Sequence, residues 1–120
     1  MRFRVVSWIG CFLGDSPELQ IEIDMLTHIV IWKYQADVEV EVRDEHVRLL
    51  RKLPPFIKEI ESLSVGFDVL RLPRSYDSGL VATFKDRAAL HAYTIHPEHI
   101  KAAAFGKTIS EHVASVDFED

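Results

Sequence analysis

Side chains that can take part in proton transfer are concentrated between Asp86 and His99. This stretch contains the phenol of Tyr93 and the imidazoles of His91, His96 and His99. A neutral imidazole can remove an acidic proton from a carbon between two carbonyl groups near neutral pH. A tyrosine hydroxyl can donate a hydrogen bond to the enolate oxygen as negative charge develops. These residue types therefore permit base catalysis on a carbonyl compound, provided that the fold brings a base and a donor together.

The elements that position these side chains are predicted to be two helices separated by a break. Asp86 is a candidate helix N-cap, and the alanine-rich residues after it favour a helix. Pro97 disfavours helical geometry at His96, so the first helix should end near residues 93–95. Proline is well tolerated at the first position of a helix, which makes His96 the cap of a second helix. A helix N-terminus disfavours a charged imidazole, so His99 in the first turn is expected to be neutral.

Structural roles compete with catalysis for the same residues. A histidine before a proline is most simply a helix cap, and Tyr93 can be a half-buried core aromatic with a satisfied hydroxyl. We weight these structural roles ahead of catalysis, most heavily for His96. Of the other histidines, we expect His28 inside a buried strand, His46 and His91 at the surface or in a groove, and His112 at a strand edge.

Other kinds of chemistry have little support in the sequence. His96, Glu98 and His99 resemble metal ligands, but Pro97 interrupts their geometry and spacing fixes no third ligand. No serine lies in a glycine elbow, and Cys11 lies far from the histidine-rich stretch. The sequence contains no glycine-rich phosphate loop and no dinucleotide-binding fingerprint. We therefore expect neither a metal nor a cofactor.

Length and charge limit the class of protein. A chain of 120 residues can bury the core of one domain and not of two. The net charge of -5 argues against a nucleic-acid binder, and no basic stripe offsets it. The longest apolar run is too short to span a bilayer, so no membrane partner is expected. A single cysteine cannot form an internal disulfide, which favours a cytoplasmic location.

Residues 1–24 are predicted to be an N-terminal extension, either non-native or partly ordered, ahead of a domain at 25–120. Residues 5–13 faintly imitate a signal peptide, but the apolar part before Cys11 is shorter than such a segment needs. Residues 14–18 are typical of a turn, and residues 19–24 alternate like a short strand.

The rest of the chain predicts an α+β fold. The expected elements, in order, are a strand at 26–34, a helix at about 40–53, a strand at 60–72 with an irregularity at Gly66, a strand at 77–85, two helices over 86–108 and a strand at 112–119. This β-α-β-β-α-β order predicts a ferredoxin-like, four-stranded antiparallel sheet with helices on one face. The first strand is apolar on both faces, so the second face of the sheet needs cover. We expect a second copy to supply it in a homodimer.

The sequence from Met25 to Glu119 resembles the stress-responsive A/B barrel (Dabb) domain family. The resemblance rests on the following segments: His28 to Lys33, Leu53-Pro54, Val65 to Val69, Tyr76 to Val81, Thr83-Phe84, Ala89 to His99 and Val116 to Glu119. It implies a ferredoxin-like protomer that forms a homodimeric α/β barrel. It does not settle function, because most members have no assigned chemistry.

One branch of the family includes a plant polyketide cyclase that closes a ring by intramolecular aldol condensation. By resemblance to that enzyme, His99 would be the general base and Tyr93 the residue that holds or polarises the substrate. The histidine of the first strand, His28, also has a counterpart there.

Two functions remain open. The first is a small homodimeric protein that binds a small apolar molecule, with His28 and His96 as binding residues and no fixed chemistry. The second is a cofactor-free cyclase, lyase or monooxygenase that acts on an apolar carbonyl compound, with His99 as base and Tyr93 as its partner. A cavity lined by the base and the phenol would favour the enzyme, whereas a filled interior would favour the binding protein.

Overall fold

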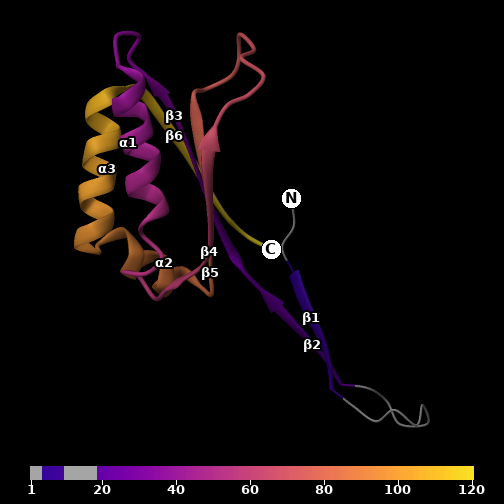
Figure 1. Cartoon of the computed structure of the whole chain (residues 1–120). Helices are drawn as coiled ribbons and strands as arrows, with labels where there is room; N and C mark the ends of the chain where they lie inside the picture. Colours follow the sequence, from indigo (N-terminus) through magenta and orange to yellow (C-terminus); the bar gives the residue numbers. More distant parts are fainter. Residues whose placement is uncertain (1–3, 10–18) are drawn as a thin grey trace.

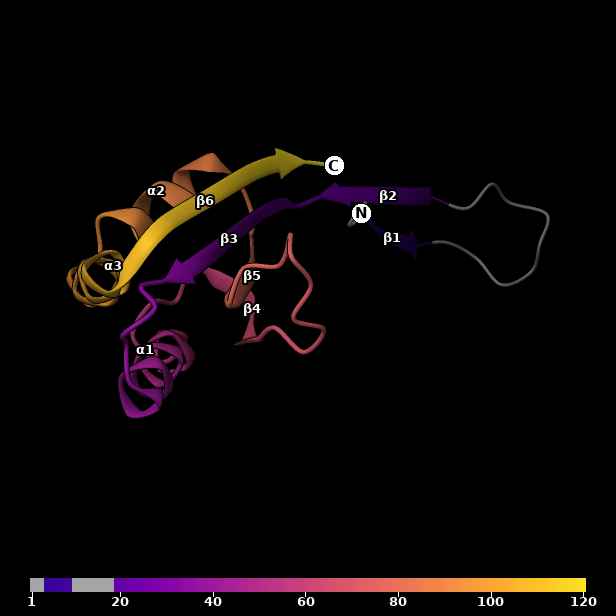
Figure 2. The ribbon, with the colours of Figure 1, turned by 90° about the horizontal axis from the view of Figure 1, so that it is seen from above.

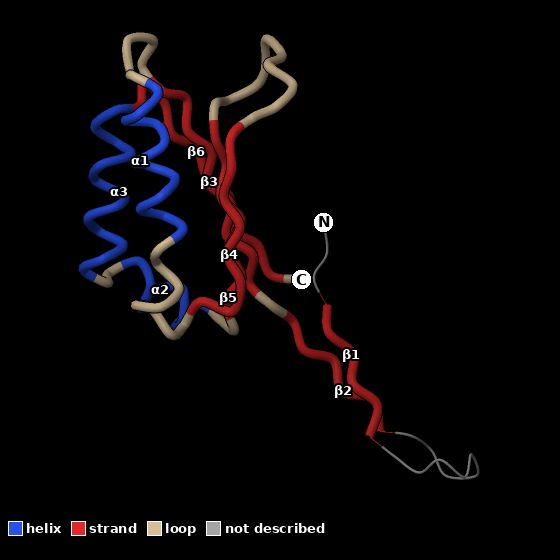
Figure 3. Tube along the Cα trace, viewed as in Figure 1, coloured by secondary structure: helices blue, strands red, loops and turns tan. Residues whose placement is uncertain are grey.

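The computed structural model describes residues 4–9 and 19–120 of the chain. From residue 26 onward the chain forms two layers, a sheet and a set of helices that cover one of its faces (Figure 1, Figure 3). The elements of this unit are β3 (Leu26–Tyr34), α1 (Val40–Arg51), β4 (Ile60–Phe67), β5 (Ser78–Phe84), α2 (Arg87–Thr94), α3 (Pro97–Ile109) and β6 (Ser110–Glu119).

The four strands of this unit lie in the order β4-β5-β3-β6, and every neighbouring pair is antiparallel. The first and last strands, β3 and β6, are therefore side by side although they are far apart in the sequence. This arrangement confirms the predicted ferredoxin-like protomer and its β-α-β-β-α-β order.

The strand β4 differs from its prediction in length and in the position of its irregularity. It ends well before the end of the predicted 60–72 strand. The irregularity expected at Gly66 is wrong, because Gly66 pairs in register with Gly79 and the register shifts between Ile60 and Ser62 instead. The glycine thus lies in a regular part of the ladder.

The loop after Phe67 is held by ionic contacts that end the strand. The carboxylate of Asp68 accepts a hydrogen bond from the backbone N–H of Arg71 at 2.7 Å. Arg71 has a φ of 52°, in the left-handed region that reverses the chain. Its guanidinium lies 2.9 Å from a carboxylate oxygen of Asp77, the residue immediately before β5.

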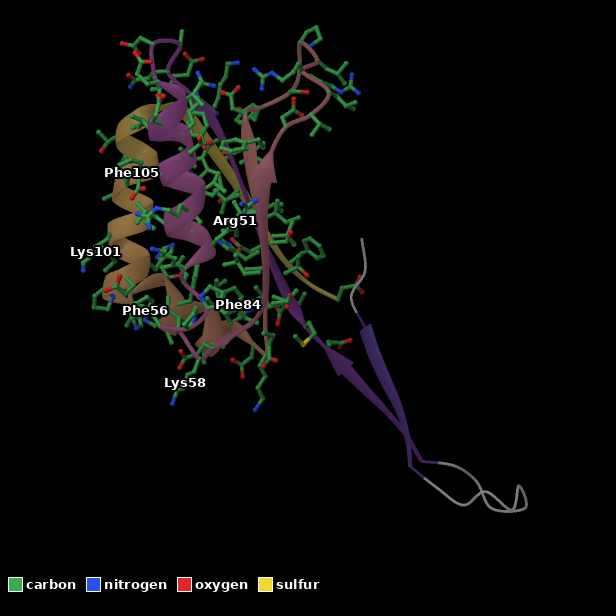
Figure 4. All side chains as sticks on the ribbon, viewed as in Figure 1. Arg51, Phe56, Lys58, Phe84, Lys101 and Phe105 are labelled. Atoms are coloured by element: carbon green, nitrogen blue, oxygen red, sulfur yellow. The ribbon has the colours of Figure 1, made fainter. Side chains whose placement is uncertain are left out.

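The hydrophobic core lies between the sheet and the helices. Leu80 and Phe84 of β5 are 1% and 0% exposed, and Figure 4 shows Phe84 between the two layers. Leu50 of α1 packs in the same cluster. Each such side chain contributes about 1.5–3 kcal/mol to folding through its removal from water. The strands therefore present alternate residues to the helices.

The other face of the sheet carries apolar side chains that no helix of the described chain covers (Figure 2). Ile29 of β3 pairs with Val81 of β5 on one side and with Val116 of β6 on the other. Paired residues share a face in an antiparallel ladder, so these three form one apolar row. Val81 and Val116 remain 36% and 53% exposed.

The helix α1 buries one residue that was expected at the surface. Val47 and Leu50 lie on its buried face. His46 lies beside them with no exposed surface, so its expected surface position is wrong. Its ring is buried because it packs between Trp32 and Tyr34, with ring centroids 4.8 Å and 5.5 Å away. Sequence spacing placed His46 on the apolar face of the helix, and its polarity misled the assignment.

The break between α2 and α3 is formed by the predicted caps. The carboxylate of Asp86 accepts the backbone N–H of Ala89 at 2.9 Å at the start of α2. His96 caps α3, since its Nδ1 accepts the backbone N–H of Glu98 at 3.1 Å, and Pro97 is the first residue of the helix. The two caps turn the chain so that α3 runs back along the sheet (Figure 1).

The described part of the extension is an antiparallel pair, β1 (Arg4–Ile9) and β2 (Leu19–Asp24). It projects beyond the end of the sheet, with β2 joined to β3 through Met25 alone (Figure 2). The strand predicted at 19–24 is confirmed. The turn predicted at 14–18 and Cys11 lie outside the described residues.

Candidate functional site

A cavity of about 570 Å³ opens between the sheet and the helix α3. This volume lies within the range of small-molecule binding sites. Its lining comes from every layer around it: His28, Val30 and Trp32 of β3, Leu50 of α1, Leu80 of β5, Tyr93 of α2, His99, Ala103 and Lys107 of α3, and Ser110, Glu111, His112, Val113 and Ser115 of β6. Of the predicted site residues, the cavity brings together His28, Tyr93 and His99.

His99 is oriented by the backbone at the end of α2. Its Nδ1 lies 3.0 Å from the carbonyl oxygen of Thr94. A carbonyl oxygen can only accept, so Nδ1 carries the proton and Nε2 keeps a lone pair. Burial lowers the pKa of His99, with further lowering from His28 and His96 and an opposing effect of the Thr94 hydrogen bond. The ring is therefore a neutral base near pH 7, as the sequence predicted, although burial rather than the helix terminus is the chief cause.

Tyr93 packs directly on this base. Its ring centroid lies 4.2 Å from that of His99, and the side chain is 1% exposed. Burial raises the pKa of Tyr93 to about 12, so the hydroxyl keeps its proton at neutral pH. No residue of the described chain forms a hydrogen bond with that hydroxyl, which leaves it as a donor at the cavity wall.

His28 carries a second oriented imidazole at the same end of the cavity. Its Nδ1 lies 2.5 Å from Oδ1 of Asp117 on the neighbouring strand β6. The carboxylate accepts, so Nδ1 of His28 carries a proton and Nε2 points away from Asp117. Its centroid is 5.8 Å from that of Tyr93, on whose ring His99 also packs.

Asp117 was not among the predicted site residues. The signal for it was present in the sequence, because a carboxylate interrupts the apolar Val116 and Phe118 of the last strand. Only the register of β6 against β3 pairs Asp117 with His28, however, and the sequence does not give that register.

His96 lies apart from the cavity lining. Its ring is used in capping α3, where Nδ1 accepts the N–H of Glu98. The structural role weighed for His96 is therefore the one that the geometry displays. The structural role considered for Tyr93 was a core aromatic with a satisfied hydroxyl. Its hydroxyl does not fit that role, since no described residue forms a hydrogen bond with it.

A second polar cluster lies behind the cavity and joins three buried side chains. The hydroxyl of Tyr34 lies 2.7 Å from Nδ1 of His46 and 2.8 Å from Oγ of Ser78. Burial lowers the pKa of His46 to about 4, so the ring stays neutral in the folded protein. This cluster fixes Trp32, whose ring packs on His46 and also lines the cavity.

Comparison with known proteins places the chain in context. The family model described as Stress Responsive A/B Barrel Domain (Dabb) matches residues 26–120. A search of curated protein sequences found no match. No helix among the described residues is long and apolar enough to cross a membrane.

Solved structures with the same fold include proteins described as dimeric. A dimeric ferredoxin-like protein of unknown function from Bacteroides fragilis is 29% identical, with a TM-score of 0.72 over 80% of this chain and 96% of its own. One from Thermobifida fusca is 25% identical, with a TM-score of 0.73 over 79% and 90%. A hydroxynitrile lyase from Passiflora edulis has a TM-score of 0.74 over 82% and 94%, at 15% identity. At this low identity, the hydroxynitrile lyase and this chain share a fold and no more is shown.

Proposed function

The chain belongs to the stress-responsive A/B barrel domain family, and we propose that it binds a small apolar carbonyl compound and removes a proton from it. The observation that carries this proposal is the hydrogen bond from Nδ1 of His99 to the carbonyl of Thr94. That bond leaves a neutral Nε2 as a base in a wall of the cavity. Membership in the family assigns no chemistry, so the geometry of His99 is what supports a base.

The proposed step is proton abstraction next to a carbonyl group. Nε2 of His99 takes the proton from the α-carbon, and the electron pair of the broken C–H bond forms the enolate. The Tyr93 hydroxyl donates a hydrogen bond to the enolate oxygen, where charge develops. The imidazolium of His99 then returns its proton to carbon. In a second route the enolate carbon instead attacks another carbonyl within the same molecule, and the imidazolium gives its proton to the alkoxide oxygen that forms. The second route corresponds to the cyclase alternative.

His28 would assist at the same end of the cavity. Asp117 fixes the ring of His28 through Nδ1 and stabilises its protonated form. His28 could therefore accept a hydroxyl proton from the substrate while His99 holds the proton from carbon. Because Tyr93 contacts both rings, the three groups surround one reacting centre.

Deuterium incorporation tests the proposal without knowledge of the natural substrate. Phenylacetone in D₂O serves as an apolar probe, and NMR follows the loss of its α-protons. We expect the wild-type protein to accelerate exchange, and His99→Gln to remove at least about a hundredfold of that acceleration. Tyr93→Phe should lower it as well, whereas His91→Gln, at an exposed position of α2, is the matched control.

The outcomes separate catalysis from binding alone. Equal exchange in wild type and His99→Gln would contradict the assignment of the base. Saturable binding of phenylacetone without accelerated exchange would leave a binding protein, the first of the two functions inferred from the sequence.

For the assembly, we propose a homodimer that buries the exposed face of the sheet. The apolar row of Ile29, Val81 and Val116 lies on the face opposite the helices. The related structures from Bacteroides fragilis and Thermobifida fusca are described as dimeric. A second copy that packs sheet against sheet would cover this row and leave the cavity, on the helix side, within each protomer.

A further inference from the structure

The cavity has two chemically different ends. The histidine end contains His99, and α3 continues from there for eight residues to Lys107, which lines the other end. At the helical rise this distance is about 12 Å. Along β3 the path from His28 to Trp32 is about 13 Å at the rise of an extended strand. Figure 1 shows α3 lying along β3 and β6 over this length.

The wall between the two ends is mainly apolar. Val30 and Leu80 pair across β3 and β5, and Leu50 and Ala103 face them from the helices. Ser115 of β6 is the polar residue of this middle section. An extended hydrocarbon chain would bury its surface there, while a charged group would lose its hydration.

Hydrogen-bond donors predominate at the far end. Oγ of Ser110 is buried and has no partner in the described chain. Lys107 is exposed and forms no ion pair with a described residue. The Lys107 ammonium and the Ser110 hydroxyl can both donate to an oxygen-rich ligand.

The acceptors at this end are largely occupied. The carbonyl oxygens of Lys107 and Ile109 accept the N–H groups of Ser110 and Gln35. Nε2 of Gln35 donates a hydrogen bond to the carbonyl oxygen of Thr108. The remaining acceptor in the lining is the carboxylate of Glu111, which is exposed and therefore screened by water.

We propose that the ligand is an elongated keto acid, with its carbonyl at the histidines and a carboxylate held by Lys107 and Ser110 at the far end. This inference rests on the proposed function for the orientation of the ligand, since it assigns the carbonyl to His99. It adds a second recognition point and a required length. A short keto acid could reach one end or the other, but not both.

Calorimetric binding of three probes tests this inference. The probes are 10-oxoundecanoic acid, its methyl ester and levulinic acid, which is a short keto acid. We expect the long acid to bind more tightly than both others. Lys107→Met should weaken binding of the long acid about fivefold or more and leave the ester unchanged. Glu111→Gln should strengthen binding of the acid, because it removes a like charge.

The matched control is Lys101→Met on the same helix. Lys101 lies on the side of α3 that faces away from the sheet (Figure 4), and its ammonium is 3.3 Å from Glu98. Its replacement removes the same charge and should leave the Kd of the long acid unchanged. Ser110→Ala should weaken binding of the acid, since it removes a donor from the carboxylate site.

The result that would overturn the inference is equal binding of acid and ester, or equal effects of Lys107→Met and Lys101→Met. Failure of the long acid to bind would overturn it as well. These results are independent of the proposed catalysis, because binding is measured without turnover. If His99→Gln exchanges deuterium like wild type while Lys107 still selects the acid, the base assignment fails and the ligand class stands.

Discussion

The imidazole of His28 and the carboxylate of Asp117 meet across the β3–β6 ladder, with Nδ1 and Oδ1 2.5 Å apart. This contact fixes the ring from the side away from its Nε2. His99 is fixed in the same sense by the carbonyl of Thr94. Two histidines thus lie beside one tyrosine, and each is oriented by an acceptor in a different element.

Replacement of Asp117 should reduce proton transfer through His28. We expect Asp117→Asn to lower the exchange rate roughly tenfold, because the ring loses a charged acceptor that fixes its tautomer. In a His28→Gln background the same change should have little further effect. Exchange rates of the two single variants and the double variant measure this coupling. Additive losses would contradict a role for Asp117 that acts through His28.

Acid should destabilise the protein through His46. Burial lowers its pKa to about 4, against an ordinary value of 6.5. The folded state therefore binds fewer protons than the unfolded state between these values, so stability is fully present above pH 6.5 and is lost as the pH falls toward 4. The loss contributed by this group approaches about 3 kcal/mol.

Urea unfolding across this pH range measures the effect. His91→Gln, which removes an exposed histidine, should leave the acid sensitivity as it is. A His46→Gln variant that folds should lose part of it. Stability that stays constant from pH 7 to pH 4 would contradict the buried, neutral state of His46.

Gly106 should be required for the close approach of α3 to α1. A Cβ at this position would lie 2.5 Å from Nε2 of His46 and 3.0 Å from Nε1 of Trp32, and both rings are buried. Alanine normally stabilises a helix interior by about 1 kcal/mol relative to glycine. Here we expect Gly106→Ala to destabilise the fold by about 1–3 kcal/mol through overpacking. Urea unfolding shows whether the substitution raises or lowers the free energy of unfolding. A gain in stability would contradict the packing described.

Charge on the exposed face of the sheet should dissociate the proposed dimer. Val116 is 53% exposed in the protomer, so Val116→Asp should cost the isolated fold little while it desolvates a charge at the interface. Val40→Asp, at a 66% exposed position of α1, is the control. Sedimentation at micromolar concentration should give a dimer for wild type and Val40→Asp and a monomer for Val116→Asp. A monomeric wild type would contradict the sheet-to-sheet assembly.

The elements and caps could be predicted from the sequence because their signals are local. Asp86 and Pro97 lie within a few residues of the helix ends that they define, and the β-branched and aromatic residues of 26–34 mark β3 without reference to the rest of the chain. The end of β4 could not be predicted in this way. The loop that follows it contains contacts of Arg71 with Asp68 and Asp77, which join residues from both sides of the loop.

The candidate site was predicted only in part for the same reason. Tyr93 and His99 are close in sequence and converge through the turn between two helices. Asp117 is 89 positions from His28 in the sequence and reaches it only through the register of two strands. No periodicity in the sequence encodes that register. His46 was placed wrongly because its burial depends on Trp32 and Tyr34, which are aromatic rings of a different element.

The proposed proton abstraction depends on the tautomer of His99. Long-range ¹⁵N–¹H NMR correlations at neutral pH distinguish a proton on Nδ1 from one on Nε2. The hydrogen bond to Thr94 predicts a neutral ring with the proton on Nδ1, and a Nε2 signal that shifts when phenylacetone is added. A proton on Nε2, or a doubly protonated ring, would leave the cavity without its base and would contradict the account.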